Sequence, residues 1–298
     1  GSLETGKETA PGQLTSSKLR DIYRVCDKRD SFKIYGVIGN PVYKSMGYLI
    51  HNRAFKEIGS NDIYIPFLVD NVEKFFKGFS PYLEGLSVTM PFKEDIISMM
   101  DEIDEMATKI GAVNTVVREG KGWKGYNTDC MGALKAIEKH VDLKNKNVLI
   151  IGAGGTAKAI GQGVYEKGAK ITVTYNRDKE KGIQLGRELE AKVVSIQEID
   201  NEEIDVLINC SPVGMSPNLE ETPISSRCLR KGMVVFDSVY NPLETRLIRE
   251  AKVAGCVTIS GVELFVNQAV GQFELWTRQK APAELMRDVV LQGLDSKI

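Results

Sequence analysis

The sequence is short of the residues that metal sites and disulfide frameworks require. It contains only two histidines, His51 and His140, and its five cysteines are widely scattered without a C-x-x-C pair. Zinc sites draw on closely spaced cysteines and histidines, and disulfide frameworks use an even number of cysteines. We therefore predict no metal site and reduced thiols, which indicates a reducing compartment.

Long apolar runs and an excess of one charge are missing as well. No stretch approaches the ~18 apolar residues of a membrane span, and the N-terminus lacks the charged-then-apolar order of a secretory signal. The 39 basic and 40 acidic residues give a net charge of −1, so nothing marks a surface for the phosphates of nucleic acid. We expect a soluble protein of the cytoplasm or a plastid, with neither membrane nor nucleic acid as a partner. Gly1-Ser2 resembles the remnant of a proteolytic cut, so the lack of a leader sequence here says nothing about targeting of the native protein.

The chain does contain enough apolar material for a large core. Hydrophobic residues make up 42% and charged residues 27% of its 298 positions, as in ordinary globular proteins. This length is about twice the ~150 residues typical of one domain, so two domains are expected.

Strand and helix patterns alternate in both halves of the chain, which predicts two α/β domains built on mostly parallel sheets. In the first half the expected strands are 33–39, 62–69 and 83–88, with helices at 49–58 and 72–79. In the second half the expected strands are 147–151, 170–175, 193–195, 206–209 and 234–237, with a helix at 156–167, an order typical of a Rossmann-type doubly wound domain. Helices at 262–278 and 282–294 are expected to return to the first domain. The predicted domains are 1–31 as a linker or N-terminal remnant, 32–131 with 262–298 as the substrate-binding domain, and 132–261 as the nucleotide-binding domain.

A glycine-rich turn marks the expected nucleotide site. Gly152, Ala153, Gly154 and Gly155 follow an apolar strand and precede a helix in the pattern G-x-G-x-x-A. The first glycine permits the tight turn, the second lets a pyrophosphate approach the backbone, and the helix N-terminus attracts its charge. The alternative is a strand-to-helix turn that binds nothing, but the flanking elements favour nucleotide binding.

The residues after the next strand bear on which dinucleotide is bound. Asn176, Arg177 and Asp178 stand about 24 residues past Gly152, where such folds contact the adenosine ribose. Arg177 suits the 2′-phosphate of NADP, whereas Asp178 would repel a phosphate and suits the free ribose of NAD. We predict NAD with NADP left open, against the alternative that both side chains are solvated turn residues.

In the first domain, two titratable residues follow expected strands. Lys93 lies close after the strand at 83–88, and Asp129 lies just before a helix that leads into the nucleotide domain. A lysine beside an aspartate can move the proton of a substrate hydroxyl while hydride leaves the adjacent carbon. Taken singly, Lys93 is as readily an exposed lysine and Asp129 a helix N-cap.

Eight blocks of sequence resemble the shikimate dehydrogenases and their quinate dehydrogenase relatives, in order and from Phe32 onward. They are Gly39-Asn-Pro-Val42, Ile50-His-Asn52, Ser87–Lys93, Gly111-Ala-Val-Asn-Thr115, Gly125–Asp129, Gly152–Gly155, Asn209–Met215 and Asp237–Thr245. In addition, Thr9–Gln13 resembles the end of a dehydroquinate dehydratase domain, which implies fusion to such a domain in a longer chain.

The resemblance implies a reversible hydride transfer between a nicotinamide and a ring carbon of a cyclic polyhydroxy carboxylate. It implies that Lys93 and Asp129 are the catalytic pair. By the same resemblance, the residues that contact the substrate are Ser45, Thr89, Asn114, Tyr240 and Gln268, and those that contact the cofactor are Gly152–Gly155, Asn176 and Arg177.

Two departures from the family pattern bear on specificity. The family's usual Gly-His-Ser-x-Ser-Pro is replaced here by 43–48, so that Ser45 remains and Gly47 stands where a second serine is usual. We predict that Gly47 removes a donor to the carboxylate and opens space for the tetrahedral C1 of quinate, with Tyr43 or Lys44 as a replacement contact. Asp178 stands where NADP-dependent members usually carry threonine.

These departures favour a quinate dehydrogenase that uses NAD, with shikimate as a second substrate. Thr89 is as in shikimate enzymes, so an NADP-dependent biosynthetic shikimate dehydrogenase is the alternative. A third alternative is a nucleotide sensor that has lost catalysis, against which Lys93 and Asp129 argue, since both are present.

Overall fold

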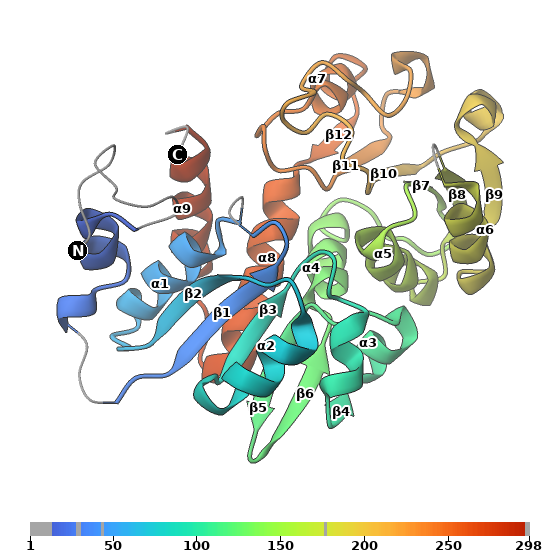
Figure 1. The fold of residues 1–298 in the computed structure, drawn as a ribbon. Coiled ribbons are helices and arrows are strands. Elements are labelled where there is room, and N and C mark those ends of the chain that lie inside the picture. Colours follow the sequence, from blue (N-terminus) through green and yellow to red (C-terminus); the bar gives the residue numbers. More distant parts are fainter. Residues whose placement is uncertain (1–13, 28–30, 43–44, 176–177, 296–298) are drawn as a thin grey trace. The chain divides into compact units, whose positions relative to one another are not determined.

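The computed structural model describes residues 14–27, 31–42, 45–175 and 178–295. These residues form two six-stranded sheets in two compact units (Figure 1). Unit 1 takes its described residues from Gly1–Ile103, Val113–Tyr126 and Gln272–Val290, and unit 2 from Asp104–Ala112, Asn127–Gly271 and Leu291–Ile298. The two α/β units confirm the predicted fold class.

Unit 1 is built on a mixed sheet with the strand order β2-β1-β3-β5-β6-β4. Its strands are β1 (Ile34–Gly39), β2 (Ile63–Leu68), β3 (Gly85–Val88), β4 (Glu102–Ile103), β5 (Thr115–Glu119) and β6 (Gly122–Tyr126). β1 runs parallel to β2 and β3, and β4 parallel to β6, whereas β5 is antiparallel to β3 and β6. The sequence predicted the parallel strands β1 to β3 and missed the β5–β6 hairpin. Its turn is built on Gly120, whose φ of +63° is one that glycine adopts without strain.

Helices α1 (Gly47–Glu57) and α2 (Val72–Phe79) follow β1 and β2, close to the ranges expected from the sequence. Asn71 caps α2, because its side chain accepts the backbone N–H of Lys74 at 2.8 Å. Asn52 joins α1 to β2: its Nδ2 donates to the Tyr64 carbonyl at 2.8 Å, and its Oδ1 accepts the Tyr64 N–H at 3.0 Å. The amide therefore fixes α1 against the strand that it covers. Unit 1 also contains four short helical turns: η1 (Lys18–Ile22), η2 (Val25–Asp27), η3 (Ser80–Tyr82) and η4 (Asp95–Met99).

Unit 2 is built on a parallel sheet with the order β12-β11-β10-β7-β8-β9. The strands are β7 (Asn147–Ile151), β8 (Lys170–Tyr175), β9 (Lys192–Ser195), β10 (Val206–Asn209), β11 (Val234–Asp237) and β12 (Val257–Ile259). This is the 3-2-1-4-5-6 order of a Rossmann fold, with the strand order reversing between β7 and β10. Alternate residues of β7 enter different cores, Val148 and Ile150 on one face and Leu149 and Ile151 on the other. Both faces of the sheet are therefore covered, which explains the nearly continuous apolar strands.

The helices of unit 2 cover that sheet on its two faces (Figure 1). They are α3 (Glu105–Ile110), α4 (Thr128–Ile137), α5 (Gly155–Glu166), α6 (Lys179–Glu188) and α7 (Arg246–Val253), with the short turns η5 (Ile196–Asn201) and η6 (Ser226–Cys228). Residues of α4 and α5 pack on the face that Val148 and Ile150 enter, and residues of α7 pack on the opposite face.

The last two helices contribute to both units. In α8 (Gly261–Thr277) the residues up to Gly271 belong to unit 2 and those from Gln272 to unit 1, and in α9 (Ala283–Asp295) the division falls after Val290. The units also differ from the predicted domain ranges at 104–112 and 127–131, which lie in unit 2. Of the C-terminal residues, Gln272–Val290 belong to unit 1 with the first part of the chain.

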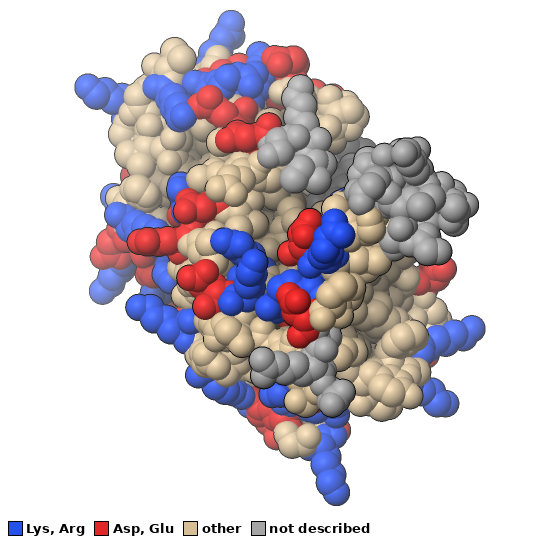
Figure 2. Space-filling model, turned by 90° about the vertical axis from the view of Figure 1, so that its left-hand side faces the viewer, with Lys and Arg blue, Asp and Glu red and all other residues tan. Residues whose placement is uncertain are grey.

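Among the described residues, membrane-spanning helices and metal-ligand clusters are absent, and the surface charges of the face in Figure 2 are mixed. None of the described helices has the length and hydropathy needed to cross a membrane. Among the same residues, no three His, Cys, Asp or Glu side chains gather in a way that could hold a metal ion. On the face drawn in Figure 2, basic and acidic side chains are interspersed, as expected from the nearly balanced charge.

Candidate functional site

Unit 1 places Lys93, Asn114 and Thr89 together through main-chain hydrogen bonds. The Val88 N–H donates to the Asn114 carbonyl at 2.8 Å, so Asn114 lies beside the carboxyl end of β3, where Thr89 follows. The Lys93 carbonyl accepts the N–H of Val113 at 2.8 Å, one residue before Asn114. Ligands of parallel α/β sheets bind at the carboxyl ends of strands. Three of the predicted site residues are therefore neighbours at this edge.

Ser45 and Gly47 lie beside Tyr64, at the start of α1. The Ser45 Oγ accepts the Gly47 N–H at 3.3 Å. A Cβ at Gly47 would lie 3.1 Å from Tyr64 Oη and 3.3 Å from Ser45 Oγ. The tyrosine hydroxyl therefore lies in the direction of the missing Cβ, and the space for the tetrahedral C1 of quinate stays a prediction. Tyr43 and Lys44, the predicted replacement contacts, lie outside the described residues.

Asp129 belongs to unit 2, in the first turn of α4. It is 8% exposed, and its backbone N–H donates to Asn127 Oδ1 at 3.1 Å. Asn127 also accepts the N–H of Cys130 at 3.3 Å and donates to the Ala112 carbonyl at 2.9 Å. The alternative that Asp129 is the N-cap is wrong, since Asn127 performs that role. The pairing of Asp129 with Lys93 stays a prediction.

Gln268 and Tyr240 also belong to unit 2, on either side of Phe265. The rings of Tyr240 and Phe265 stack with their centroids 4.5 Å apart, and Gln268 Nε2 donates to the Phe265 carbonyl at 2.9 Å. A Cβ at Gly132, one turn after Asp129, would lie 2.9 Å from the Gln268 backbone N. The close approach of α4 and α8 therefore brings the segments that carry Asp129 and Gln268 together, and Tyr240 joins them through Phe265.

The glycine turn has the form that a pyrophosphate requires. Gly152 has a φ of +105°, and a Cβ there would lie 3.3 Å from the backbone of Cys210 at the end of β10. Gly154, the N-cap of α5, would direct a Cβ into open space, so a ligand can reach its backbone. No described side chain caps α5, and its first turn holds no acidic residue. The segment Gly152–Gly155 therefore fits a dinucleotide phosphate at a helix N-terminus.

Asp178 has a structural use that the sequence did not reveal. Its Oδ1 accepts the backbone N–H of Lys181 at 3.0 Å, which makes it the N-cap of α6. Its Oδ2 lies 3.7 Å from Lys181 Nζ. The aspartate is exposed, so its charge also remains near the end of β8. Asn176 and Arg177, the other predicted ribose contacts, lie outside the described residues.

A buried carboxylate at the end of β11 holds the loops at the carboxyl edge of the unit 2 sheet. Asp237 is fully buried and accepts three hydrogen bonds, from Asn209 Nδ2 at 2.9 Å, the Val239 N–H at 3.0 Å and Thr245 Oγ1 at 2.6 Å. Burial raises its pKa to about 6, while these bonds oppose the rise. The sequence showed Asn209 and Asp237 only as parts of motif blocks. Tyr240 follows this anchor directly.

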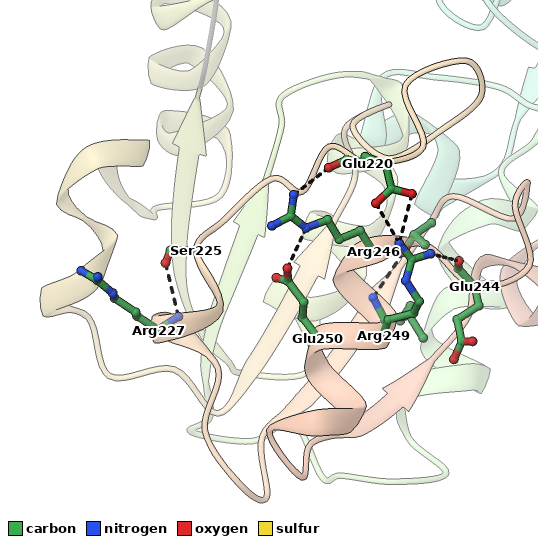
Figure 3. A network of polar contacts seen from close by, with 9 residues as sticks. Glu220, Ser225, Arg227, Glu244, Arg246, Arg249 and Glu250 are labelled. Atoms are coloured by element: carbon green, nitrogen blue, oxygen red, sulfur yellow. Dashed lines mark hydrogen bonds and ion pairs between the residues drawn. The ribbon is translucent and has the colours of Figure 1, made fainter.

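A surface network fastens the loop between β10 and β11 to α7 (Figure 3). Arg246 donates to the Glu220 carbonyl at 2.8 Å and to Glu250 at 2.7 Å, and Arg249 reaches the Glu220 carboxylate at 3.3 Å. Lys252 pairs with Glu244. Exposed pairs of this kind contribute at most about 1 kcal/mol each, so Asp237 is the stronger anchor of this region.

Sequence reasoning missed a second set of polar residues, in unit 1. Ser87, Thr115 and Gln272 are buried within elements that otherwise read as apolar. The available signal was the polar residue at an inward position of a strand or helix, which a fold tolerates only when it is hydrogen-bonded.

Three family models match this chain, and their order follows the two units. They are the shikimate dehydrogenase substrate binding domain over residues 37–116, shikimate / quinate 5-dehydrogenase over 134–239, and the shikimate 5'-dehydrogenase C-terminal domain over 261–291. A relative from Arabidopsis thaliana, a chloroplastic bifunctional 3-dehydroquinate dehydratase/shikimate dehydrogenase, is 42% identical over 305 residues. That match covers 96% of this chain and 50% of the relative, so the chain spans half the length of that protein.

Relatives and solved structures of matching length agree. A shikimate dehydrogenase (NADP(+)) of Methanosarcina acetivorans is 40% identical over 281 residues, which cover 89% of this chain and 99% of the relative. A crystal structure of a shikimate dehydrogenase in complex with NADP+ superposes with a TM-score of 0.85 and 35% identity, over 90% of this chain and 97% of that chain. A quinate dehydrogenase from Corynebacterium glutamicum in complex with NAD gives a TM-score of 0.82 at 27% identity, over 88% and 100% of the two chains. The chain therefore belongs to the shikimate/quinate dehydrogenase family of oxidoreductases.

Proposed function

We propose that this protein is an NADP-dependent shikimate dehydrogenase that reversibly oxidises one ring hydroxyl of shikimate to 3-dehydroshikimate. This was the alternative in the sequence analysis, and the relatives named as NADP-dependent shikimate dehydrogenases favour it over the quinate-first prediction. The observation that carries the proposal is the meeting of Lys93, Thr89 and Asn114 at the carboxyl edge of the unit 1 sheet.

In the proposed reaction the substrate C–H bond and its O–H bond both break, and a ketone forms. Lys93 and Asp129 take the hydroxyl proton and pass it to solvent, while Thr89 and Asn114 hold neighbouring ring hydroxyls and Ser45 binds the carboxylate. The nicotinamide cofactor supplies the acceptor for the hydride, which carries the two electrons. Gly152–Gly155 hold the cofactor's pyrophosphate, and Tyr240 and Gln268 contact the substrate. Fusion to a dehydroquinate dehydratase domain, as the name of the Arabidopsis relative states for that protein, is part of this proposal.

A four-way kinetic comparison tests the proposal. Purified protein is assayed with shikimate or quinate and with NADP or NAD, by the absorbance of the reduced nicotinamide. We expect the highest kcat/KM for shikimate with NADP. No change in absorbance in any of the four combinations would favour the nucleotide sensor and contradict the enzymatic assignment.

Quinate with NAD is the second candidate, because two residues of this chain favour it. Gly47 removes a serine hydroxyl from the proposed carboxylate site, and the exposed carboxylate of Asp178 stands close after β8. Each residue has its own test.

Replacing Gly47 by serine is expected to raise the kcat/KM for shikimate relative to quinate by roughly ten- to a hundredfold. The added hydroxyl restores a hydrogen bond to a charged group, which is worth about 1.5–3 kcal/mol. Gly47→Ala is the matched control, since it adds the Cβ beside Tyr64 Oη without the hydroxyl. An unchanged substrate ratio in Gly47→Ser would remove residue 47 from specificity, and an equal change in both variants would assign the effect to packing against Tyr64.

Replacing Asp178 by asparagine is expected to raise the ratio of kcat/KM with NADP to that with NAD by about fivefold or more. Asparagine keeps an oxygen that can cap α6 but removes the charge, and one charge at about 4 Å in water is worth about 1 kcal/mol. Glu180→Gln removes the other exposed carboxylate in the first turn of the same helix, one that does not cap it, and serves as the control. The same ratio in both variants would show that Asp178 acts only as a cap.

A further inference from the structure

A buried chain of hydrogen bonds in unit 1 ends on the carboxamide of Asn114. Tyr64 Oη donates to Ser87 Oγ at 2.7 Å, and Ser87 Oγ donates to Gln272 Oε1 at 2.8 Å. Gln272 Nε2 donates to Thr115 Oγ1 at 3.2 Å, and Thr115 Oγ1 donates to Asn114 Oδ1 at 2.7 Å. All of these side chains are buried, and they come from β2, β3, α8 and the start of β5.

The backbone carbonyl of Asn114 can only accept a hydrogen bond, and it fixes the direction of the bonds that link Tyr64, Ser87 and Gln272. Gln272 Nε2 also donates to the backbone carbonyl of Asn114 at 3.3 Å, so the amino side of the Gln272 amide faces that carbonyl and its oxygen faces Ser87. Ser87 must then donate to Gln272, and Tyr64 must donate to Ser87. On the other side, Thr115 accepts from Gln272 and donates its own proton to Asn114 Oδ1.

Neighbouring aromatic side chains hold these hydrogen-bonded residues in place and add no charge beside them. Trp276 Nε1 donates to the Val116 carbonyl at 3.0 Å, which holds α8 against β5 one turn after Gln272. The His51 ring stacks on Tyr64 with a centroid distance of 4.5 Å. Burial lowers the pKa of His51 to about 3, so this imidazole is neutral at physiological pH and cannot reverse the bonds by its charge.

We propose that this relay, defined as Tyr64–Ser87–Gln272–Thr115–Asn114, sets the polarity of the Asn114 carboxamide. With Oδ1 held by Thr115, Asn114 presents its amino group on the opposite side, toward an acceptor oxygen of the substrate. The ligand that this donor suits is a ring hydroxyl oxygen or the ketone oxygen formed from it. Thr115 is then a positioning residue that acts through Asn114. This inference rests on the proposed function and adds the residue that orients one of its contacts.

The test replaces Thr115 by valine, which keeps the shape and removes the hydroxyl. Without that donor the carboxamide can turn over and present Oδ1 to the substrate. We expect the KM for shikimate to rise about tenfold, with a matching rise in the Kd for shikimate by titration calorimetry, while the KM for NADP stays unchanged. Thr115→Ser restores the donor and is expected to return both constants close to the wild-type values.

A control separates orientation from stability. Thr277→Val also removes the hydrogen bond of a partly buried hydroxyl on α8. Thr277 Oγ1 donates to the Phe273 carbonyl at 2.7 Å, but Thr277 lies outside the relay. We expect it to lower the melting temperature without changing the KM for shikimate. Active wild-type enzyme with an unchanged KM in Thr115→Val, or no rescue by serine, would overturn the relay alone. Wild-type protein without activity on shikimate or quinate would overturn the proposed function, and the relay's role with it.

Discussion

Replacing Lys93 by methionine is expected to lower kcat by about a hundredfold to ten-thousandfold, the usual share of a positioned general acid or base. Methionine keeps the length and the apolar stem of lysine, and it removes the ammonium group that would exchange the substrate's hydroxyl proton. Lys93 leaves β3 through the turn that also carries Thr89, and its carbonyl is held by Val113. The change should therefore leave the backbone of the site in place. Steady-state kinetics with shikimate and NADP measures the effect.

Two further variants show which property of Lys93 matters. Lys93→Arg keeps the positive charge, but a guanidinium does not release its proton in a protein, so kcat should remain low. Lys77→Met, on the exposed side of α2, removes a lysine away from the site and should be as active as the wild type. Cofactor binding, measured by fluorescence of the reduced nucleotide, should be unchanged in all three, since Gly152–Gly155 belong to unit 2. Full activity in Lys93→Met would remove Lys93 from the mechanism.

Replacing Asp237 by alanine is expected to lower the free energy of unfolding by about 3–5 kcal/mol, the largest loss of stability that we predict. Alanine would leave the three donors from Asn209, Val239 and Thr245 buried without their acceptor. Urea denaturation followed by far-UV circular dichroism measures the effect. Both tryptophans, Trp123 and Trp276, lie in unit 1, so their fluorescence gives a separate record of the other unit in the same experiment. A loss below about 1 kcal/mol would contradict the anchoring role.

Asp237→Asn is the matched variant, and it isolates the charge. The asparagine oxygen can still accept from Asn209 and Val239, and its amino group can donate to Thr245, so its loss of stability at neutral pH should be small.

Burial raises the pKa of Asp237 from 3.8 to about 6, so the folded protein binds this proton before the unfolded chain does as the pH falls. The contribution of the carboxyl group to the free energy of unfolding therefore rises as the pH falls through this window. Between about pH 7.5 and about pH 4.5 the wild type should gain about 2 kcal/mol relative to Asp237→Asn. If the difference in the free energy of unfolding between the two proteins did not change with pH, the raised pKa of Asp237 would be contradicted.

The elements that the sequence predicted well are those in which the local pattern and the tertiary role agree. β1 ends in Gly39 and β7 is followed directly by Gly152; both strands are largely buried and lie inside their sheets. The turn at Gly152 could be located because a tight turn, an open Gly154 backbone and a following helix all require small residues at fixed spacing. The fold class and the family resemblance are confirmed for this reason.

The elements that were missed depend on contacts between distant segments. The β5–β6 hairpin lies between two motif blocks and shares only their ends. It carries Arg118 and Lys124 among its residues, so it lacked a long apolar run. The relay could not be derived, because Ser87 and Gln272 are far apart in the sequence and their hydrogen bond exists only in the folded unit. The cap formed by Asp178 shows a third limit: one carboxylate fits both a cofactor contact and a helix terminus, and spacing alone does not separate them.

The β5–β6 hairpin also offers a practical handle on this protein. Thr115 pairs with Tyr126 at its open end, so the strands leave the site and return to it, and the tip at Gly120 and Lys121 is exposed. Extra residues at such a tip do not disturb the paired strands. A short peptide tag or a dye-labelled cysteine inserted between Gly120 and Lys121 would therefore report on the enzyme, or tether it to a support, while Asn114 and Thr115 keep their places.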